Sequence, residues 1–177
     1  MGRNEPIIFM SRPLEFIASY LAKLRNGKEV NYGAMTYGSI RGSEEAHYIG
    51  LYAEVAIAHY YDAKLDYNIY KRGDNGIDLI IKNLPICVKA TTYWRRPFLR
   101  VEVEHFKPEC IYFCTAVDIE NRLVRLVGWA KSQTVLSANT RTFVNNGPLN
   151  YVLEDFDLIE FTKQPLDVSI KTRKGDA

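Results

Sequence analysis

The sequence predicts an α/β fold, a sandwich in which a central mixed sheet is flanked by helices. The first 65 residues carry two stretches with helical periodicity, and from residue 66 onward the apolar pattern becomes that of strands. Helices followed by a strand meander and a further helix are typical of this class. The chain has 177 residues, of which 47% are hydrophobic and 25% are charged, as expected for one ordinary globular domain.

Both N-terminal helices have recognisable ends. The first is predicted in PLEFIASYLAKLRNGK, with Ser11 as a candidate N-cap and Asn26-Gly27 as a candidate stop. A polar, Gly-rich stretch separates it from a longer helix, SEEAHYIGLYAEVAIAHYYDA, capped by Ser43. Glu54 lies on the flank of the apolar stripe of this second helix, where a solvated side chain is the ordinary expectation.

The remaining elements are mostly short strands separated by turn residues. The predicted strands are Tyr67–Tyr70, Ile77–Lys82, Ile86–Thr92, Leu99–Val103, Ile111–Asp118 and Arg122–Trp129. A short helix (Lys131–Ser137) and a turn-rich loop lead to a last strand near Leu158–Phe161. We therefore expect one domain over residues 1–177, with a helical lead at about 11–42, a core at about 43–137, and a C-terminal strand and basic tail at 138–177.

Bulk charge and hydropathy exclude several classes of protein. The formal net charge is only +2, so any nucleic-acid surface has to come from local clustering of Lys and Arg. No segment resembles a signal peptide or approaches a membrane span. We expect a cytoplasmic protein, of a cell or of a virus-infected host, without a membrane partner.

The stretch GDNGIDLIIKNLPICVKATTYW places one acid and one base inside apolar runs. Asp78 lies in IDLII and Lys89 in ICVKA, and burying a lone charge is costly unless it is paired or binds something. With Asn83-Leu84-Pro85 as a turn, Asp78 falls opposite Lys89 or its immediate neighbour. The pair is then either an incidental cross-strand ion pair in a structural domain or part of a functional site.

A resemblance favours the functional interpretation. Gly73-x-x-Gly76-x-Asp78, followed by an apolar strand that ends in Val88-Lys89, resembles the PD-(D/E)xK nuclease superfamily, and most closely its small phage, archaeal-virus and Holliday-junction-resolvase-like members. GLYAEVAIAHYYDA resembles the family's first core helix. RLVRLVGWAKSQTVL resembles a strand and helix of several members. Together these motifs span roughly residues 43–137.

The resemblance implies a restriction-endonuclease-like fold and metal-dependent hydrolysis of DNA. Many related enzymes are homodimers, so the resemblance also implies a homodimer. Mg²⁺ or Mn²⁺ would be held by Asp78, by the main-chain carbonyl of Val88, and by Glu54 on the neighbouring helix. Lys89 would orient or deprotonate the attacking water and stabilise charge on the phosphate.

Cys87 departs from the family pattern, which has Asp or Glu two residues before the lysine. A thiolate is a soft ligand and a poor match for Mg²⁺. Three explanations remain open. Another acid replaces it, with Glu54, Glu102 or Glu104 as candidates; or the site works with Mn²⁺ or with one carboxylate; or the protein binds nucleic acid, or a protein partner, without cutting.

The segment after the lysine, TTYWRRPFLR, mixes hydroxyl, aromatic and basic side chains. Such clusters stack on bases and bind phosphates, although a loop with buried aromatics and solvated arginines gives the same pattern. The candidate nucleic-acid-binding residues are Thr91, Thr92, Tyr93, Trp94, Arg95 and Arg96, with Arg41 from the Gly-rich loop.

Overall fold

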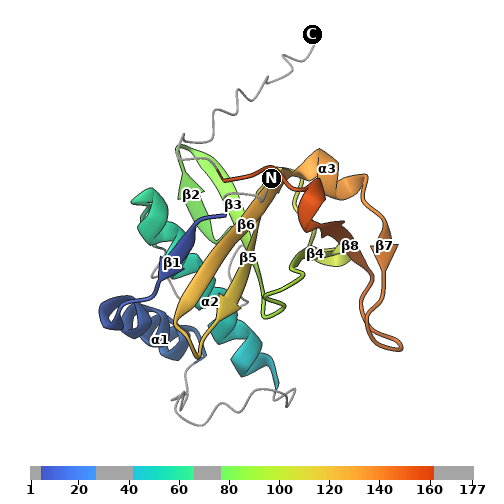
Figure 1. Ribbon diagram of the computed structural model, residues 1–177. Helices are drawn as coiled ribbons and strands as arrows, with labels where there is room; N and C mark the ends of the chain where they lie inside the picture. The colour runs from blue at the N-terminus through green and yellow to red at the C-terminus, as the bar shows by residue number, and fades with distance from the viewer. Residues whose placement is uncertain (1–4, 27–41, 66–76, 162–177) are drawn as a thin grey trace.

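A computed structural model describes residues 5–26, 42–65 and 77–161 of the chain (Figure 1). The helices of these segments are α1 (Arg12–Asn26), α2 (Gly42–Tyr61) and the short α3 (Ser132–Leu136), with 3-10 turns at Val103–His105 and Asp155–Asp157. The strands are β1 (Ile7–Phe9), β2 (Leu79–Ile81), β3 (Leu84–Thr91), β4 (Phe98–Glu102), β5 (Ile111–Asp118), β6 (Leu123–Lys131), β7 (Thr140–Arg141) and β8 (Asn150–Glu154).

Five of the strands form a mixed sheet in the order β1-β6-β5-β3-β2. β3 and β5 run parallel, and the other neighbours are antiparallel. The connection between the two parallel strands passes through β4. The predicted α/β class with a mixed sheet is confirmed.

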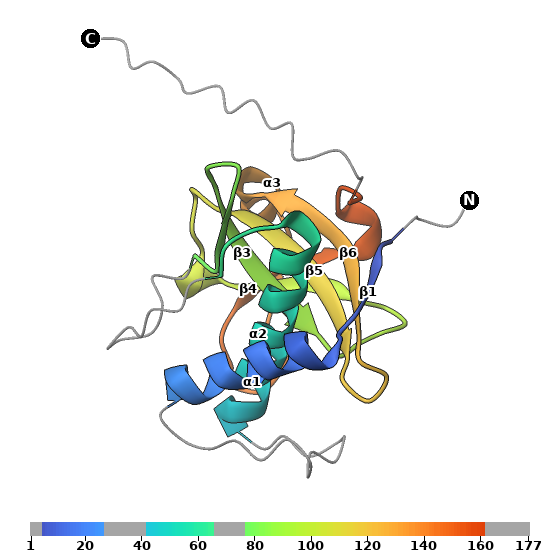
Figure 2. The ribbon, with the colours of Figure 1, turned by 90° about the vertical axis from the view of Figure 1, so that its left-hand side faces the viewer.

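One face of this sheet is covered by the two long helices (Figure 2). α2 packs on the sheet and α1 packs on α2, so side chains from Leu51 to Ala58 of α2 are buried on all sides. α1 begins directly after Ser11, as the sequence predicts, and the N–H of Glu15 donates to the Ser11 carbonyl at 3.0 Å.

The opposite face carries a second, smaller sheet instead of a layer of long helices. β4, β8 and β7 form this sheet, and α3 packs against β6 and β8. A separate core lies between the two sheets, with Cys87, Leu99, Tyr112 and Leu153 among its buried side chains. The long helices expected to flank the sheet therefore lie on one face, and the other face carries the second sheet with the five-residue α3.

The strand predictions differ from the structure mainly at the edges. β5 has the predicted bounds, whereas β1, β7 and β8 were not predicted. The predicted last strand, Leu158–Phe161, is wrong, because Ile159 makes only an isolated bridge to Trp129 while β8 provides the regular strand earlier. The predicted strand Tyr67–Tyr70 lies outside the described residues.

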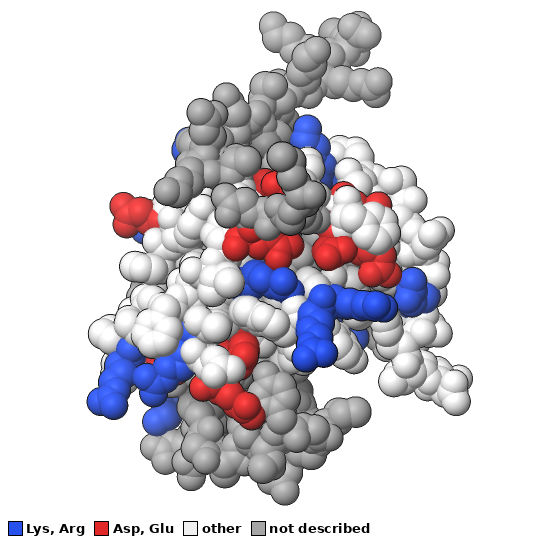
Figure 3. All heavy atoms as spheres, viewed as in Figure 1, with Lys and Arg blue, Asp and Glu red and all other residues white. Residues whose placement is uncertain are grey.

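Charged side chains are unevenly distributed over the face seen in Figure 1. Lys and Arg side chains form one group toward the side that carries β4, β7 and β8 and another at the lower left, toward α1, and Asp and Glu side chains lie next to both groups (Figure 3). In the described parts of the chain, no helix is both long enough and apolar enough to cross a membrane.

Candidate functional site

The β2–β3 hairpin turns earlier than the sequence predicts. Lys82 and Asn83 both have positive φ angles, 52° and 65°, which is the pattern of a two-residue type I′ turn. β3 therefore begins at Leu84, and Pro85 belongs to the strand instead of the loop. Pro85 is tolerated because the pairing of β3 with β5 starts only at Ile86, so no ladder bond requires its missing N–H.

The earlier turn changes the partner of Asp78. Leu79 pairs with Ile86, so Asp78 lies beside Ile86 and Cys87, and the predicted register of Asp78 opposite Lys89 or its immediate neighbour is wrong. The N–H of Asp78 also donates to the Ile86 carbonyl at 2.9 Å. Asp78 and Leu79 thus both lie opposite Ile86, as in a β-bulge. A bulge changes the direction of a side chain, so Asp78 need not follow the regular alternation of side chains along β2.

The Asp78 carboxylate accepts a backbone hydrogen bond just beyond the point where the pairing of β2 with β3 ends. Its Oδ2 accepts a hydrogen bond from the Val88 N–H at 2.6 Å. Since the N–H and C=O of one strand residue point to the same side, the Val88 carbonyl also points to this edge of β3. A carboxylate and a main-chain carbonyl, both hard oxygen donors, therefore lie together at the base of the hairpin.

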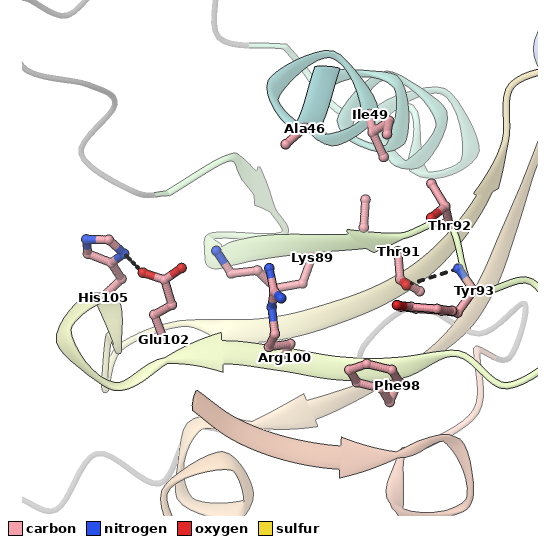
Figure 4. Close-up of a pocket in the computed structure, with 11 residues that line it drawn as sticks. Ala46, Ile49, Lys89, Thr91, Thr92, Tyr93, Phe98, Arg100, Glu102 and His105 are labelled. Carbon is pink, nitrogen blue, oxygen red and sulfur yellow. Dashed lines mark hydrogen bonds and ion pairs between the residues drawn. The ribbon is translucent and has the colours of Figure 1, made fainter. Parts of the chain in front are cut away.

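Beyond Asp78, β3 borders a cleft of about 340 Å³ (Figure 4). β2 pairs only with Leu84–Ile86, so the later part of β3 has no strand partner on this side among the described residues. The N-terminal half of α2 forms one wall and β4 forms the other. The lining residues are Ala46, Ile49, Lys89, Ala90, Thr91, Thr92, Tyr93, Phe98, Arg100, Glu102 and His105.

Polar groups of both signs face this cleft. Figure 4 shows Lys89 and Arg100 side by side, with Glu102 at one end. Glu102 Oε2 lies 3.0 Å from His105 Nδ1, an ion pair when the imidazole is protonated. Thr91 lies at the other end, where its hydroxyl accepts a hydrogen bond from the Tyr93 N–H at 3.1 Å. The cleft combines two cations, hydroxyl groups and one carboxylate, a set that suits a phosphate group.

Cys87 is fully buried between the hairpin and the second core, with 2% of its surface exposed. The hydrogen bond between its thiol and that of Cys110, together with burial, raises the pKa of the Cys87 thiol. The nearby charge of Asp78 raises it further. Cys87 is therefore a neutral thiol at neutral pH and a poor ligand for a hard cation.

Glu54 is buried instead of solvated. Its Oε2 accepts a hydrogen bond from Arg25 Nη1 of α1 at 3.3 Å, and both side chains are about nine-tenths buried, with 9% and 12% exposed. α2 instead contributes the small or apolar side chains of Ala46 and Ile49 to the cleft. The structure thus brings Asp78, Val88, Cys87 and Lys89 together and places Glu54 at the contact of the two helices.

The predicted nucleic-acid-binding residues divide into groups. Thr91, Thr92 and Tyr93 line the cleft, whereas Trp94 packs on the second core beneath Arg125, whose guanidinium carbon lies 5.0 Å from the Trp94 ring centre. Arg95 and Arg96 are exposed but do not line the cleft. Arg41 lies outside the described residues.

The sequence did not predict Phe98, which lines the cleft, or Phe143, which does not line it but packs on Phe98. Phe98 stacks on Tyr93, and Phe143, forty-five positions later, stacks on Phe98. The sequence contains no periodic signal for Phe143, because it lies in a loop after β7. The alternation of Phe98, Arg100 and Glu102 along one strand is a signal that could have been used, since these residues share a face.

The donor atoms present define which metal the site could hold. In the described residues, no three His, Cys, Asp or Glu side chains lie close enough together to bind one ion. The Asp78 carboxylate and the Val88 carbonyl remain as two oxygen donors, and Mg²⁺ is commonly bound through one or two carboxylates with water and substrate phosphate completing its shell. The pair fits such an ion and does not fit a fully enclosed metal site.

Comparison with known proteins adds no relative. No protein-family model matches the sequence, and no curated protein or solved structure shows significant similarity to it.

Proposed function

We propose that this protein is a metal-dependent nuclease of the PD-(D/E)xK type, with a restriction-endonuclease-like fold, that hydrolyses phosphodiester bonds of DNA. The observation that carries the proposal is the 2.6 Å bond from the Val88 N–H to Asp78. It holds a carboxylate at the start of an open strand edge, next to a cleft that Lys89 and Arg100 line. The motifs around Asp78 and Lys89 support the same family.

Asp78 and the Val88 carbonyl would hold Mg²⁺ or Mn²⁺. Such an ion supplies Lewis-acid polarisation of the phosphate and lowers the pKa of a bound water. The remaining ligand positions would be taken by water and by phosphate oxygens of the DNA.

The side chains of the cleft would then position the reacting groups. Lys89 orients the attacking water and neutralises charge that develops on the phosphate, and Arg100 donates hydrogen bonds to its oxygens. The water oxygen forms a bond to phosphorus while the bond from phosphorus to one sugar oxygen breaks. That sugar oxygen takes up a proton, and the attacking water gives one up.

Of the carboxylates that could replace the acid missing at Cys87, Glu102 is the best supported. It lines the same cleft as Lys89. Glu54 is supported less, because it already accepts a hydrogen bond from Arg25, and Glu104 does not line the cleft.

Incubation with plasmid, linear, single-stranded and branched DNA in Mg²⁺ or Mn²⁺ tests the proposal. We expect cleavage that is lost in Lys89→Ala and retained in Lys131→Ala, an exposed lysine at the end of β6 that serves as the matched control. Absence of cleavage of every substrate with both metals would contradict the proposed nuclease activity.

A second candidate function, nucleic-acid binding without cleavage, is favoured by the buried, neutral thiol of Cys87. A site with one carboxylate binds a metal ion weakly. Lys89 and Arg100 in the cleft can bind phosphate without a metal ion. Cys87→Asp distinguishes the two functions, with Cys87→Ser as the control for size. Cleavage that appears only in Cys87→Asp indicates that the wild type binds nucleic acid without cleaving it. Equal cleavage by the wild type and by Cys87→Ser indicates that the wild type is a nuclease.

A further inference from the structure

Three aromatic rings form a stack that starts at the cleft, where Tyr93 and Phe98 line it, and continues to Phe143, which packs on Phe98. The ring centres of Tyr93 and Phe98 are 5.6 Å apart with planes at 26°, and those of Phe98 and Phe143 are 5.5 Å apart with planes at 7°. The rings come from the loop after β3, from β4 and from the loop after β7, so the fold brings three separate segments together. We call these three residues the aromatic rim.

The outer members of the aromatic rim remain accessible to solvent. Tyr93 is 64% exposed and Phe143 is 40% exposed, while Phe98 is partly buried between them. Figure 4 shows the Tyr93 ring beside Phe98 at the end of the cleft that also holds Thr91. A large aromatic side chain at the edge of a polar cleft offers a flat apolar surface on which another ring can stack.

Two arginines connect the aromatic rim to the cationic part of the cleft. The guanidinium carbons of Arg100 and Arg141 lie 5.5 Å and 6.0 Å from the centre of the Phe143 ring. Arg100 also lines the cleft with Lys89. Exposed rings next to a cationic groove are the combination by which proteins hold single-stranded nucleic acid, with bases on the rings and phosphates on the cations.

We infer that the nucleic acid bound at this cleft is single-stranded there, and that an unpaired base stacks on the aromatic rim while adjacent phosphates contact Lys89 and Arg100. The inference rests on the proposed function and adds the substrate class. In a duplex both faces of a base are covered by its neighbours, so only an unstacked base can stack on a protein ring. The rim would therefore select single-stranded segments, flaps or frayed ends over intact duplex.

Fluorescence anisotropy with labelled DNA in EDTA, which prevents metal-dependent cleavage, measures this preference. The probes are a single strand, its intact duplex, and the same strand with abasic sites, which keeps the phosphates and removes bases. We expect the wild type to bind the single strand most tightly, and Tyr93→Ala and Phe143→Ala each to weaken that binding by roughly 5- to 150-fold, the range for one base on an aromatic ring.

Matched variants separate stacking from other effects. Tyr93→Phe keeps the ring and should bind as the wild type does, and Phe156→Ala removes a ring that is 75% exposed but outside the rim. Affinity for the abasic strand should be unchanged in Tyr93→Ala, since the phosphate contacts remain. Circular dichroism of each variant establishes that it is folded.

The possible outcomes distinguish this inference from the proposed function. Binding of all three probes with equal affinity, unaffected by Tyr93→Ala and Phe143→Ala, overturns the stacking inference and leaves a phosphate-binding nuclease. Loss of affinity in Tyr93→Ala that is equal for strand, abasic strand and duplex also overturns it. Absence of binding to any DNA by the wild type contradicts the proposed function and the inference together.

Discussion

At the scale of single residues, Asp78 has two separable tasks. Its carboxylate completes the hairpin by accepting the Val88 N–H, and it is also the acid on which the proposed chemistry depends. An amide in the same position keeps a carbonyl oxygen for the hydrogen bond but loses the negative charge. An alanine in this position loses both the hydrogen-bond acceptor and the negative charge.

We therefore predict different effects of Asp78→Asn and Asp78→Ala on stability and the same effect on cleavage. Asp78→Asn should change the free energy of unfolding little, while Asp78→Ala should lower it by about 1–3 kcal/mol, because a buried N–H loses its acceptor. Both variants should fail to cleave DNA. Urea denaturation and a plasmid assay measure the two properties, and full cleavage by Asp78→Asn would exclude a catalytic role for this carboxylate.

For the residues of the candidate site, the sequence singled out Asp78 and Lys89 but did not predict the register that relates them. The Asp78 and Lys89 positions were found because charged residues in apolar runs are costly. The partial burial of Trp94 and the exposure of Tyr93 could not be predicted, since adjacent residues of one loop differ only in which one the second core covers.

At the scale of elements, the contact between α1 and α2 includes a buried ion pair. Arg25 and Glu54 come from different helices and are both largely removed from water. A buried charge pair contributes little net stability when intact, but removing one partner is strongly destabilising. Sequence periodicity placed Glu54 on a helix flank and could not show that a second helix covers that flank.

Glu54→Ala should therefore lower the free energy of unfolding by about 3–5 kcal/mol, and Glu54→Gln by less, because the amide still accepts a hydrogen bond from Arg25. Urea denaturation measures both. If Glu54 acts only between the helices, folded Glu54→Gln keeps wild-type nuclease activity. If it holds a metal, this variant loses cleavage while remaining folded.

At the scale of the whole molecule, the two layers on the large sheet were unequally predictable. The helical layer followed from two long periodic segments. The second sheet did not, because two of its three strands, β7 with two residues and β8 with five, are short and have no clear alternation, so only β4 was predicted. The β2–β3 register shifted for a similar reason, since the positive φ angles of Lys82 and Asn83 are not required by residue type.

The two cores share the strands of the large sheet, and this sharing predicts one cooperative unfolding transition at alkaline pH. Tyr52 is fully buried in the helical core and Tyr112 in the core between the sheets. Burial raises the pKa of both tyrosines above the usual 10.0. Their stabilisation is therefore fully present below pH 10 and is lost above it, because only the unfolded chain releases these protons readily.

Urea denaturation between pH 9 and 11, followed by circular dichroism and by tyrosinate absorbance, tests this expectation. Above pH 10 each buried tyrosine should lower the free energy of unfolding by about 1.4 kcal/mol per pH unit, and Tyr52→Phe or Tyr112→Phe should each reduce that slope. At neutral pH Tyr52→Phe loses one hydrogen bond, which the hydroxyl donates to Glu15, and Tyr112→Phe loses two, one donated to the Lys107 carbonyl and one accepted from the Lys107 N–H; each lost bond costs about 1 kcal/mol. Because β3, β5 and β6 contribute side chains to both cores, both variants should shift the same single transition. Two separate transitions, each sensitive to only one variant, would show that the cores unfold independently.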